Sequence, residues 1–501
     1  MAREGRPLLF GERCSSVFCC SRRALGYTAA VLSARAVTVV GVSGSLWISG
    51  PSWVTLTPWK IYLCLAIPAV ILLNLAFPNF HAPDDYDHVK RAYTLLHQPF
   101  QRVTLPGRST GAMIDSGLTD YIDALVPVVK RPKGQKAPRA YRDAVRIGWT
   151  NKETFSEAPG SLSYFPLLYA PQAAMLEIGR LSGASVAQSV LWARFANGFA
   201  GIGLIALGLY WLQGLPALVL LLTLLPQTLL QFASNSADPI LYGAALVIVA
   251  LSVKADSAAR VRSSLLAAAI FISASVRPPM AALALAPAVQ AIRERRWLGL
   301  GVLIGACIIA ALWVIAVVPS TVDLRCGVTG PIGPKLRDFA LAWPMLIGRT
   351  LSARAAYFFG SFVGDYGWGD GPGGHMAAPL PAWIYGSTLL LLCLALWRDL
   401  VTRARLSPVL RLSLAVSAIC SILLIFLAMA IGCTVPNQAI IAGVQGRYFV
   451  PPLFALAPAI RGLAAGRSSV HPTFYIGILT IWVVACVVTM LLAAPHLYVR
   501  P

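Results

Sequence analysis

The sequence predicts an all-α membrane protein that crosses the bilayer many times. Of its 501 residues, 57% are hydrophobic and only 12% are charged, a composition that soluble domains of this size do not have. Apolar stretches that approach the ~20 residues needed for a membrane-crossing helix also recur along the chain. We count about eleven, within a range of about 10–13. They lie near residues 60–80, 188–212, 215–233, 238–253, 263–276, 279–292, 298–318, 381–397, 411–432, 447–460 and 473–494.

The chain divides into a leader and a membrane domain. Residues 1–58 contain several arginines and one weak apolar stretch, which predicts a basic cytoplasmic leader, partly disordered or lying on the membrane surface. A cleaved signal peptide is the alternative, and the long charged region before the apolar stretch argues against it. Residues 59–501 form the multi-spanning domain.

The basic residues set the orientation of the helices. With the N-terminus in the cytoplasm, four connections rich in Arg or Lys lie inside, as the positive-inside rule requires. They are residues 254–262, 293–296, 398–411 and 461–467. Two long segments, about 81–187 and about 319–380, then lie outside as extracytoplasmic loops. Basic loops that flank the membrane helices explain the net charge of +21, so the sequence does not indicate a nucleic-acid partner.

Two of the ten cysteines lie outside in this topology, one in the second outer loop and one in a short outer connection, residues 433–445. Because the outer compartment is oxidising, we expect Cys326 and Cys433 to form a disulfide that joins the loops; two unrelated cysteines are the alternative. The sequence contains no Cys-x-x-Cys pair, so a metal or redox motif has no support. We therefore expect no cofactor, and a divalent metal is left open without support.

A dense group of charges follows the first apolar stretch. It begins Pro-Asp-Asp-Tyr-Asp-His and contains Asp84, Asp85 and His88, with Arg91 shortly after. Charges are costly beside lipid, so such a group favours a functional site. Asp84 or Asp85 is a candidate general base that accepts a proton from an attacking hydroxyl. The alternative is an ordinary helix N-cap at Asp84.

Two aromatic segments could contact a sugar or a lipid chain. Residues 161–172 contain Tyr164 and Tyr169 among prolines, which is typical of an interfacial helix or of a groove for a long acyl or isoprenoid chain. Residues 360–370 are rich in Gly and contain Asp365, Trp368 and Asp370. Aromatic faces beside carboxylates suit sugars, with flexible padding at the interface as the alternative.

Two arginines are candidates for binding phosphate. Arg447 is an isolated cation at the mouth of a late span, next to Gln445 and Tyr448, and Arg277 lies between two short apolar stretches. A guanidinium can hold a phosphate through two hydrogen bonds, although a lone arginine can also snorkel to the interface. Asp238, followed by proline, is predicted to cap the helix that begins there.

Four of these segments carry a family resemblance. Pro83-Asp84-Asp85 with His88, and residues 165–169, 364–368 and 445–451, resemble motifs of a large family of uncharacterised bacterial multi-spanning membrane proteins. The resemblance covers roughly residues 60–460. Asp85 stands where that family usually has Glu, which leaves open which acid is the base. The family is in turn similar to the C-type (GT-C) membrane glycosyltransferases.

The resemblance implies transfer of a sugar from a polyprenyl-phosphate carrier to a cell-envelope glycan, lipid or protein outside the bacterial plasma membrane. Asp84 or Asp85 would deprotonate the acceptor. The residues implied to bind the lipid phosphate are His88, Arg91, Arg277, Arg447, Tyr448 and Gln445. The residues implied to contact the sugar or the acceptor are Tyr164, Tyr169, Asp365, Trp368 and Asp370.

Two other functions remain open on the sequence alone. A transporter or lipid flippase would place charges near the bilayer midplane and often shows two related halves. Here the polar residues gather near the outer ends of the spans, and no internal repeat is evident. A non-catalytic partner in envelope assembly is the third alternative.

Overall fold

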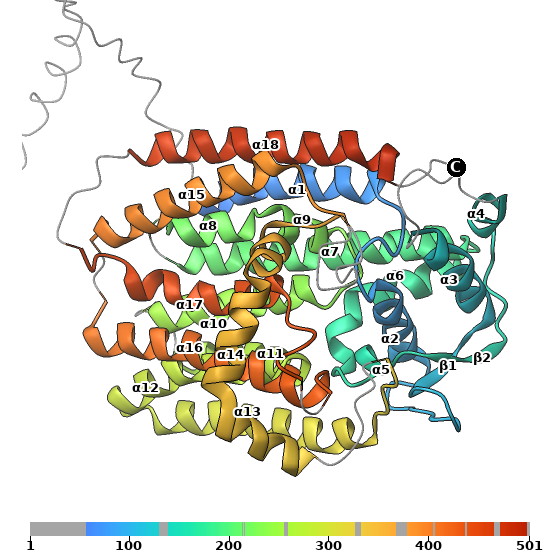
Figure 1. Cartoon of the computed structure of the whole chain (residues 1–501), viewed down its shortest axis with the longest axis horizontal. Helices are drawn as coiled ribbons and strands as arrows, with labels where there is room; N and C mark the ends of the chain where they lie inside the picture. The colour runs from blue at the N-terminus through green and yellow to red at the C-terminus, as the bar shows by residue number, and fades with distance from the viewer. Residues whose placement is uncertain are drawn as a thin grey trace, which may run out of the picture. The chain divides into compact units, whose positions relative to one another are not determined.

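The structure is a computed structural model. It describes residues 57–129, 139–212, 214, 216–254, 259–325, 332–366, 378–403, 406–435, 438–464 and 471–497. Within these ranges, six helices are long and apolar enough to cross a membrane, and they run in broadly the same direction in Figure 1. They are α1 (Pro58–Ala76), α7 (Val186–Trp211), α13 (Trp297–Val317), α15 (Ala382–Val401), α16 (Pro408–Gly432) and α18 (Pro472–Leu497). The chain is therefore a helical membrane protein, but the predicted number of about eleven spans is not confirmed.

The other predicted spans are also helical, but they are short or broken. They correspond to α8 (Ala217–Thr223), α9 (Pro226–Phe232), α10 (Asp238–Val253), α11 (Ala259–Val276), η2 (Pro278–Ala284), α12 (Leu285–Arg293), η4 (Gly446–Phe449) and α17 (Val450–Ile460). Proline causes several of the breaks, because it lacks an amide proton and disfavours helix in the preceding residue. Pro226 begins α9, and Pro278 begins η2. Hydropathy alone could not distinguish these half-helices from full spans.

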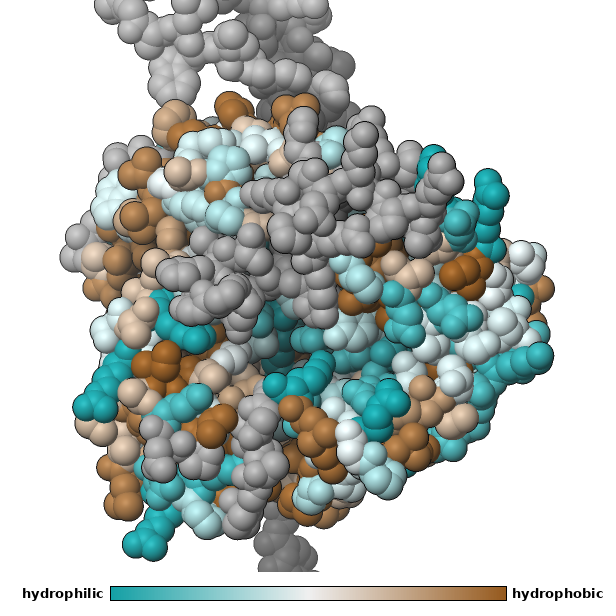
Figure 2. All heavy atoms as spheres, turned by 45° about the vertical axis from the view of Figure 1, so that its right-hand side comes forward, coloured by the Kyte–Doolittle hydropathy of each residue, from teal (hydrophilic) through white to brown (hydrophobic). Residues whose placement is uncertain are grey.

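The described residues between α1 and α7 form a subdomain. It contains α2 (Asp85–His97), β1 (Gly111–Asp115), α3 (Ser116–Val129), α4 (Arg139–Ala144), β2 (Glu153–Glu157), α5 (Pro159–Leu162), η1 (Pro166–Tyr169) and α6 (Ala170–Leu181). The two strands pair antiparallel, with Gly111 opposite Glu157 and Asp115 opposite Glu153. The subdomain has its own hydrophobic core and lies at one end of the long helices in Figure 1. In Figure 2 hydrophilic side chains gather towards the right of the view, and the face is hollowed near its centre.

The second predicted outer loop contains a long helix. After η3 (Val318–Ser320), α14 (Ile332–Val363) runs across the other helices in Figure 1 and breaks its helical geometry at Arg354. It packs against η4 and α16. The sequence predicted residues 319–380 as an extracytoplasmic loop, and the helix within it was not predicted. Five charged side chains lower the hydropathy of the helix and hide it from a search for apolar stretches.

The connections predicted to face the cytoplasm gather at a common end. Arg262 donates to the carbonyl oxygen of Leu251 and to Gln290, at 2.8 and 2.9 Å, and Arg293 donates to Ser407 at 2.9 Å. Residues 399 and 462 are joined by a backbone hydrogen bond of 2.8 Å. Each of the four basic connections thus contacts at least one other part of this end. The orientation predicted from the charges requires such an arrangement.

Candidate functional site

Asp84 lies at the start of α2 but does not cap it. Its backbone is left-handed, with φ 59° and ψ 8°, and its side chain makes no capping hydrogen bond. The side chain is 48% exposed and lies 3.4 Å from Nη1 of Arg325. Aspartate tolerates this backbone conformation better than most residues, although it still costs energy. Asp84 thus occupies the N-cap position of α2, as predicted, but its carboxylate stays accessible and does not cap the helix.

Asp85 has a different environment, although it is the next residue. Its side chain is fully buried and accepts hydrogen bonds from the backbone amides of Asn235, at 2.7 Å, and Phe80, at 3.2 Å. Burial raises the pKa of Asp85 to about 6, and the nearby Arg194 opposes this rise. Asp85 therefore ties the start of α2 to the loop before α10. It has no open path to a substrate, so of the two predicted bases only Asp84 has suitable exposure.

A salt-bridged group beside Asp84 was not predicted. Asp87 is buried and lies 2.9 Å from Nη1 of Arg325 and 3.5 Å from Nζ of Lys90. Arg325 also pairs with Asp323 at 2.8 Å. Burial raises the pKa of Asp87 to about 6, and both cations oppose the rise. Arg325 comes from the chain after η3, so the group joins the two outer segments. From the sequence, only the position of Arg325 in a predicted outer loop could have suggested that it joins this group.

His88 lies between this group and a second one. Its Nδ1 shares a hydrogen bond of 2.6 Å with the Tyr169 hydroxyl, and its ring stacks on those of Tyr164 and Tyr169 at 6.0 and 5.8 Å between centroids. Burial lowers the pKa of His88 to about 4. The charges of Asp84 and Asp238 raise this pKa, and those of Arg447 and Arg277 lower it. The imidazole is therefore neutral near pH 7 and lies in the field of both groups.

The second group consists of two arginines that share a carboxylate. Nη2 of Arg277 lies 2.6 Å from one oxygen of Asp238, and Nη1 of Arg447 lies 3.7 Å from the other. The Tyr448 ring lies beside both guanidinium groups, at 4.4 Å from Arg277 and 5.6 Å from Arg447. Asp238 was predicted to cap α10, but the N-cap is Ala237 and no side chain caps this helix. The Asp238 carboxylate pairs with the arginines instead.

Two N–H groups of these arginines have no partner. Within the described residues, Nη1 of Arg277 and Nε of Arg447 are buried and make no hydrogen bond. Among the described residues the two guanidinium cations share one carboxylate, that of Asp238, so one positive charge is left without an ion-pair partner there. Buried donors and buried charges are normally paired, since leaving them unpaired is costly. The arrangement therefore suits an anionic ligand.

Glycine allows Arg447 to reach this position. Gly446 packs so closely against α14 that a Cβ atom would collide with the carbonyl oxygen of Phe358 and with Phe362. The Gly446 amide donates to the Ser361 hydroxyl at 2.7 Å, and the Tyr242 hydroxyl donates to the Arg447 carbonyl oxygen at 2.8 Å. These contacts fix both ends of the Gly-Arg peptide. In the Gln-Gly-Arg motif, the glycine thus allows close packing against α14, and the arginine supplies the charge.

The remaining site residues do not join this cluster. The Arg91 guanidinium is buried and donates to the carbonyl oxygens of Tyr164, at 2.8 and 3.1 Å, and of Pro99, at 2.9 Å. It therefore supports the backbone instead of facing a ligand. Asp365 accepts from the Ala378 amide at 3.1 Å and holds the two ends of its loop together. Gln445 is half-buried and occupies the N-cap position before η4.

Some predictions fall outside the described residues. These are the roles of Trp368 and Asp370 and one half of the predicted disulfide, Cys326. Cys433 is disulfide-bonded, and its pairing with Cys326 stays a prediction. Among the described residues, no three or more His, Cys, Asp or Glu side chains come together in a group that could hold a metal ion.

The fold and site define a helical membrane protein with a charged site where its polar subdomain meets the helices. The chain belongs to the family described as Predicted membrane protein (DUF2142), whose model matches residues 69–456. This range includes every described residue of the two charged groups. No curated protein and no solved structure shows a significant match to the chain.

Proposed function

We propose that this protein is a membrane glycosyltransferase that moves a sugar from a polyprenyl-phosphate carrier to a cell-envelope acceptor outside the plasma membrane. One observation supports it most strongly. The neutral imidazole of His88 lies in the electrostatic field of two kinds of group. One is the accessible carboxylate of Asp84, and the other is the pair of arginines with unused hydrogen-bond donors. A transferase of this kind needs a base on one side of the reacting carbon and a site for a phosphate on the other.

Arg277 and Arg447 would bind the phosphate of the carrier. Their free N–H groups can donate to phosphate oxygens, and the uncompensated charge favours an anion. As the bond between the sugar and the phosphate breaks, its electron pair passes to the phosphate oxygen. Fixed cations at that oxygen stabilise the developing charge. Tyr448 keeps both guanidinium groups in place through its ring face.

Asp84 would act as the general base. The oxygen of the acceptor hydroxyl attacks the anomeric carbon, and its proton passes to the Asp84 carboxylate. Asp87 has another role, because its carboxylate pairs with Arg325 and Lys90 and so holds Arg325 beside Asp84. Asp85 positions the start of α2 by accepting hydrogen bonds from the backbone amides of Asn235 and Phe80. Tyr164 and Tyr169, which stack on His88, would border the sugar.

The membrane arrangement follows the orientation predicted from the charges. In this proposal the six long helices cross the bilayer together with α10, α11 and the pairs α8–α9, η2–α12 and η4–α17, giving about eleven crossings of a GT-C-like domain. The N-terminus and the basic connections face the cytoplasm. The subdomain with α2 then faces the exterior, where the acceptor is located.

A transfer assay tests the proposal. Proteoliposomes that contain the purified full chain are given a panel of polyprenyl-phosphate sugars with a radiolabelled sugar, and label in envelope acceptors is counted. Asp84→Asn should reduce transfer by about 10²–10⁴-fold, the usual contribution of a general base. Asp85→Asn should keep transfer per folded molecule within about tenfold of wild type.

Asp120→Asn is the matched control, since Asp120 is an exposed carboxylate of the same subdomain. It should leave transfer unchanged. Full transfer by Asp84→Asn would refute the assignment of the base. If the wild-type protein transfers none of the sugars but moves polyprenyl-phosphate lipids between leaflets, it is a flippase and the proposed reaction is wrong.

A further inference from the structure

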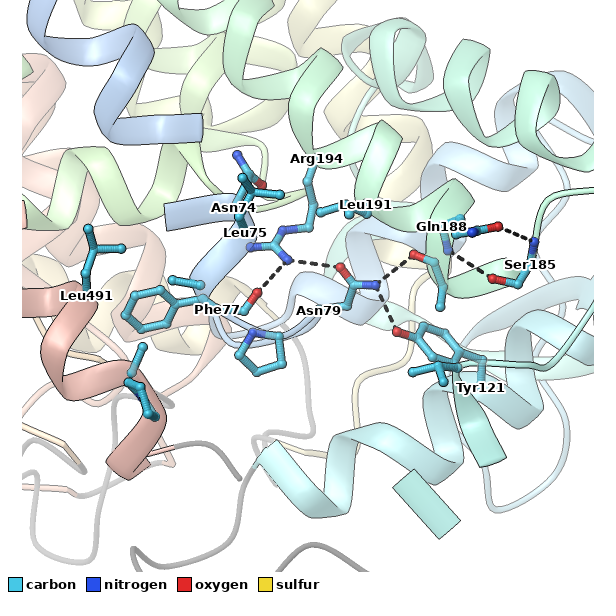
Figure 3. Close-up of a pocket in the computed structure, with 16 residues that line it drawn as sticks. Asn74, Leu75, Phe77, Asn79, Tyr121, Ser185, Gln188, Leu191, Arg194 and Leu491 are labelled. Atoms are coloured by element: carbon cyan, nitrogen blue, oxygen red, sulfur yellow. Dashed lines mark hydrogen bonds between the residues drawn. The ribbon is translucent and has the colours of Figure 1, made fainter. Parts of the chain in front are cut away.

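A cavity lies apart from the charged site. Its volume is about 710 Å³, and it is formed where α1 and α18 end and α7 begins (Figure 3). Asp84, His88, Asp238, Arg277 and Arg447 do not line it. The volume falls in the range of roughly 300–1,000 Å³ that is typical of small-molecule sites. The cavity therefore needs its own explanation.

One side of the cavity is apolar and exposed. Leu75, on α1, lines it and is 65% exposed, and Leu491 and Ala494 line it from α18. Both helices are long and apolar enough to cross a membrane. Exposed leucines on such helices face lipid chains, so a lipid can enter the cavity from the bilayer.

The polar wall is almost entirely occupied by internal hydrogen bonds. Arg194 donates to the carbonyl oxygens of Ala233 and Phe77 and to Oδ1 of Asn79, at 2.8 to 3.1 Å. Asn79 in turn donates to the Tyr121 hydroxyl at 2.8 Å. Figure 3 shows this chain of contacts crossing the wall. These groups shape the cavity without leaving an obvious site for an anion.

Asn74 is the exception. Its side chain is 2% exposed and lines the cavity, and its amide nitrogen donates to the carbonyl oxygen of Val70 at 2.9 Å. Within the described residues, its Oδ1 atom is buried and has no hydrogen-bond partner. An amide oxygen only accepts, so it is satisfied by a hydroxyl or an amine. An ionised phosphate or carboxylate would bring a second acceptor and could not pair with it.

We propose that this cavity binds a neutral lipid alcohol, a long apolar chain whose hydroxyl group donates to Oδ1 of Asn74. The chain would lie against Leu75, Leu191 and Leu491. An acylglycerol and an isoprenoid alcohol share this chemistry. The site is separate from the proposed phosphate site and does not depend on the proposed function.

The bound lipid would also brace the loop that holds the charged site. Residues 77–79 line the cavity, and the amide of the next residue, Phe80, donates to the buried carboxylate of Asp85 at 3.2 Å. The same loop thus forms the wall of the cavity and supports the start of α2. Filling the cavity reduces the freedom of this loop.

Photolabelling tests the proposal. The full chain in phosphatidylcholine nanodiscs is exposed to a diacylglycerol with a diazirine in one acyl chain, and labelled peptides are identified by mass spectrometry. We expect label within residues 57–79 and 472–497. Asn74→Leu, which removes the acceptor, should reduce labelling about fivefold to tenfold, as expected for the loss of one hydrogen bond. Leu491→Trp, which puts a larger side chain into the apolar side of the cavity, should also reduce labelling.

Leu72→Trp is the control, because Leu72 lies on the exposed side of α1 and does not line the cavity. It should label like wild type. Unlabelled dioleoylglycerol and undecaprenol are then added as competitors against the labelled probe. The one that reduces labelling more shows whether the cavity prefers an acylglycerol or an isoprenoid alcohol. Dioleoyl phosphatidic acid, which has the same chains and a phosphate, should compete poorly. Equal competition by phosphatidic acid, or wild-type labelling of Leu491→Trp, would overturn the proposal. Size-exclusion profiles confirm that each variant is folded.

Discussion

Replacement of Asp238 by asparagine should lower the stability of the protein, and the ligand of the two arginines should restore part of that stability. Asp238 is the shared partner of Arg277 and Arg447, at 2.6 and 3.7 Å. Asp238→Asn removes the carboxylate that pairs with the guanidinium groups of Arg277 and Arg447, which are 16% and 6% exposed. Breaking a buried ion pair by removing one partner costs about 3–5 kcal/mol. For a chain of this length that corresponds to a fall of about 3–5 °C in the melting temperature.

A lipid phosphate should reverse part of this loss. An anion that binds between the two arginines takes the place of the missing carboxylate, and a ligand at 100 times its Kd stabilises a protein by about 2.7 kcal/mol. The assay is thermal unfolding in detergent, followed by tryptophan fluorescence, with and without undecaprenyl phosphate. Undecaprenol has the same chain without the phosphate and should rescue nothing at this site.

The matched control is Asp120→Asn, which removes an exposed carboxylate and should unfold like wild type. The reasoning is wrong if Asp238→Asn melts within about 1 °C of wild type, since the two charges would then need no partner. It is also wrong if undecaprenol narrows the difference in melting temperature between Asp238→Asn and wild type as much as undecaprenyl phosphate does.

Two other predictions concern neighbours of the site. Arg91→Met should lower the free energy of unfolding by about 2–4 kcal/mol, because the carbonyl oxygens of Tyr164 and Pro99 lose their donor. It should not change the affinity for undecaprenyl phosphate. A selective loss of that affinity in a lipid-binding titration would contradict this prediction. For His88, the unfolded chain takes up a proton near pH 6.5, whereas the folded state does so near pH 4. Stability therefore falls as pH falls between these values, by up to ~3 kcal/mol, and His88→Gln should remove this contribution. Denaturant titrations of both proteins measure it, and parallel pH curves would count against it. Asp85 and Asp87 contribute in the opposite direction but are common to both proteins.

The positions of the membrane helices could be predicted because lipid requires locally apolar sequence. Each predicted span coincides with helix in the structure, including the broken pairs around Pro226 and Pro278. Where a helix carries charges, as α14 does, local hydropathy fails. The paired strands β1 and β2 were not predicted, because the residues that pair are about forty positions apart and have no strong alternation.

The site was predicted in part for a similar reason. Arg277, Arg447 and His88 were chosen as candidates because charge and imidazole beside membrane segments are unusual wherever they occur. The role of Asp238 could not be read from its neighbours, because its partner Arg447 is far away in sequence. The same holds for Arg325 with Asp87. The contrast between Asp84 and Asp85 depends on the loop at Asn235, which only the fold brings to α2.

Thiol modification at positions 84 and 85 tests the central claim most directly, namely that Asp84 faces the exterior beside a lipid-phosphate site. A membrane-impermeant maleimide is added to intact cells that express Asp84→Cys or Asp85→Cys. We predict that the first variant reacts, that undecaprenyl phosphate slows its reaction while undecaprenol does not, and that the second variant stays unmodified. Reaction of Asp84→Cys only after the cells are permeabilised, or at a rate that undecaprenyl phosphate does not change, would contradict the account.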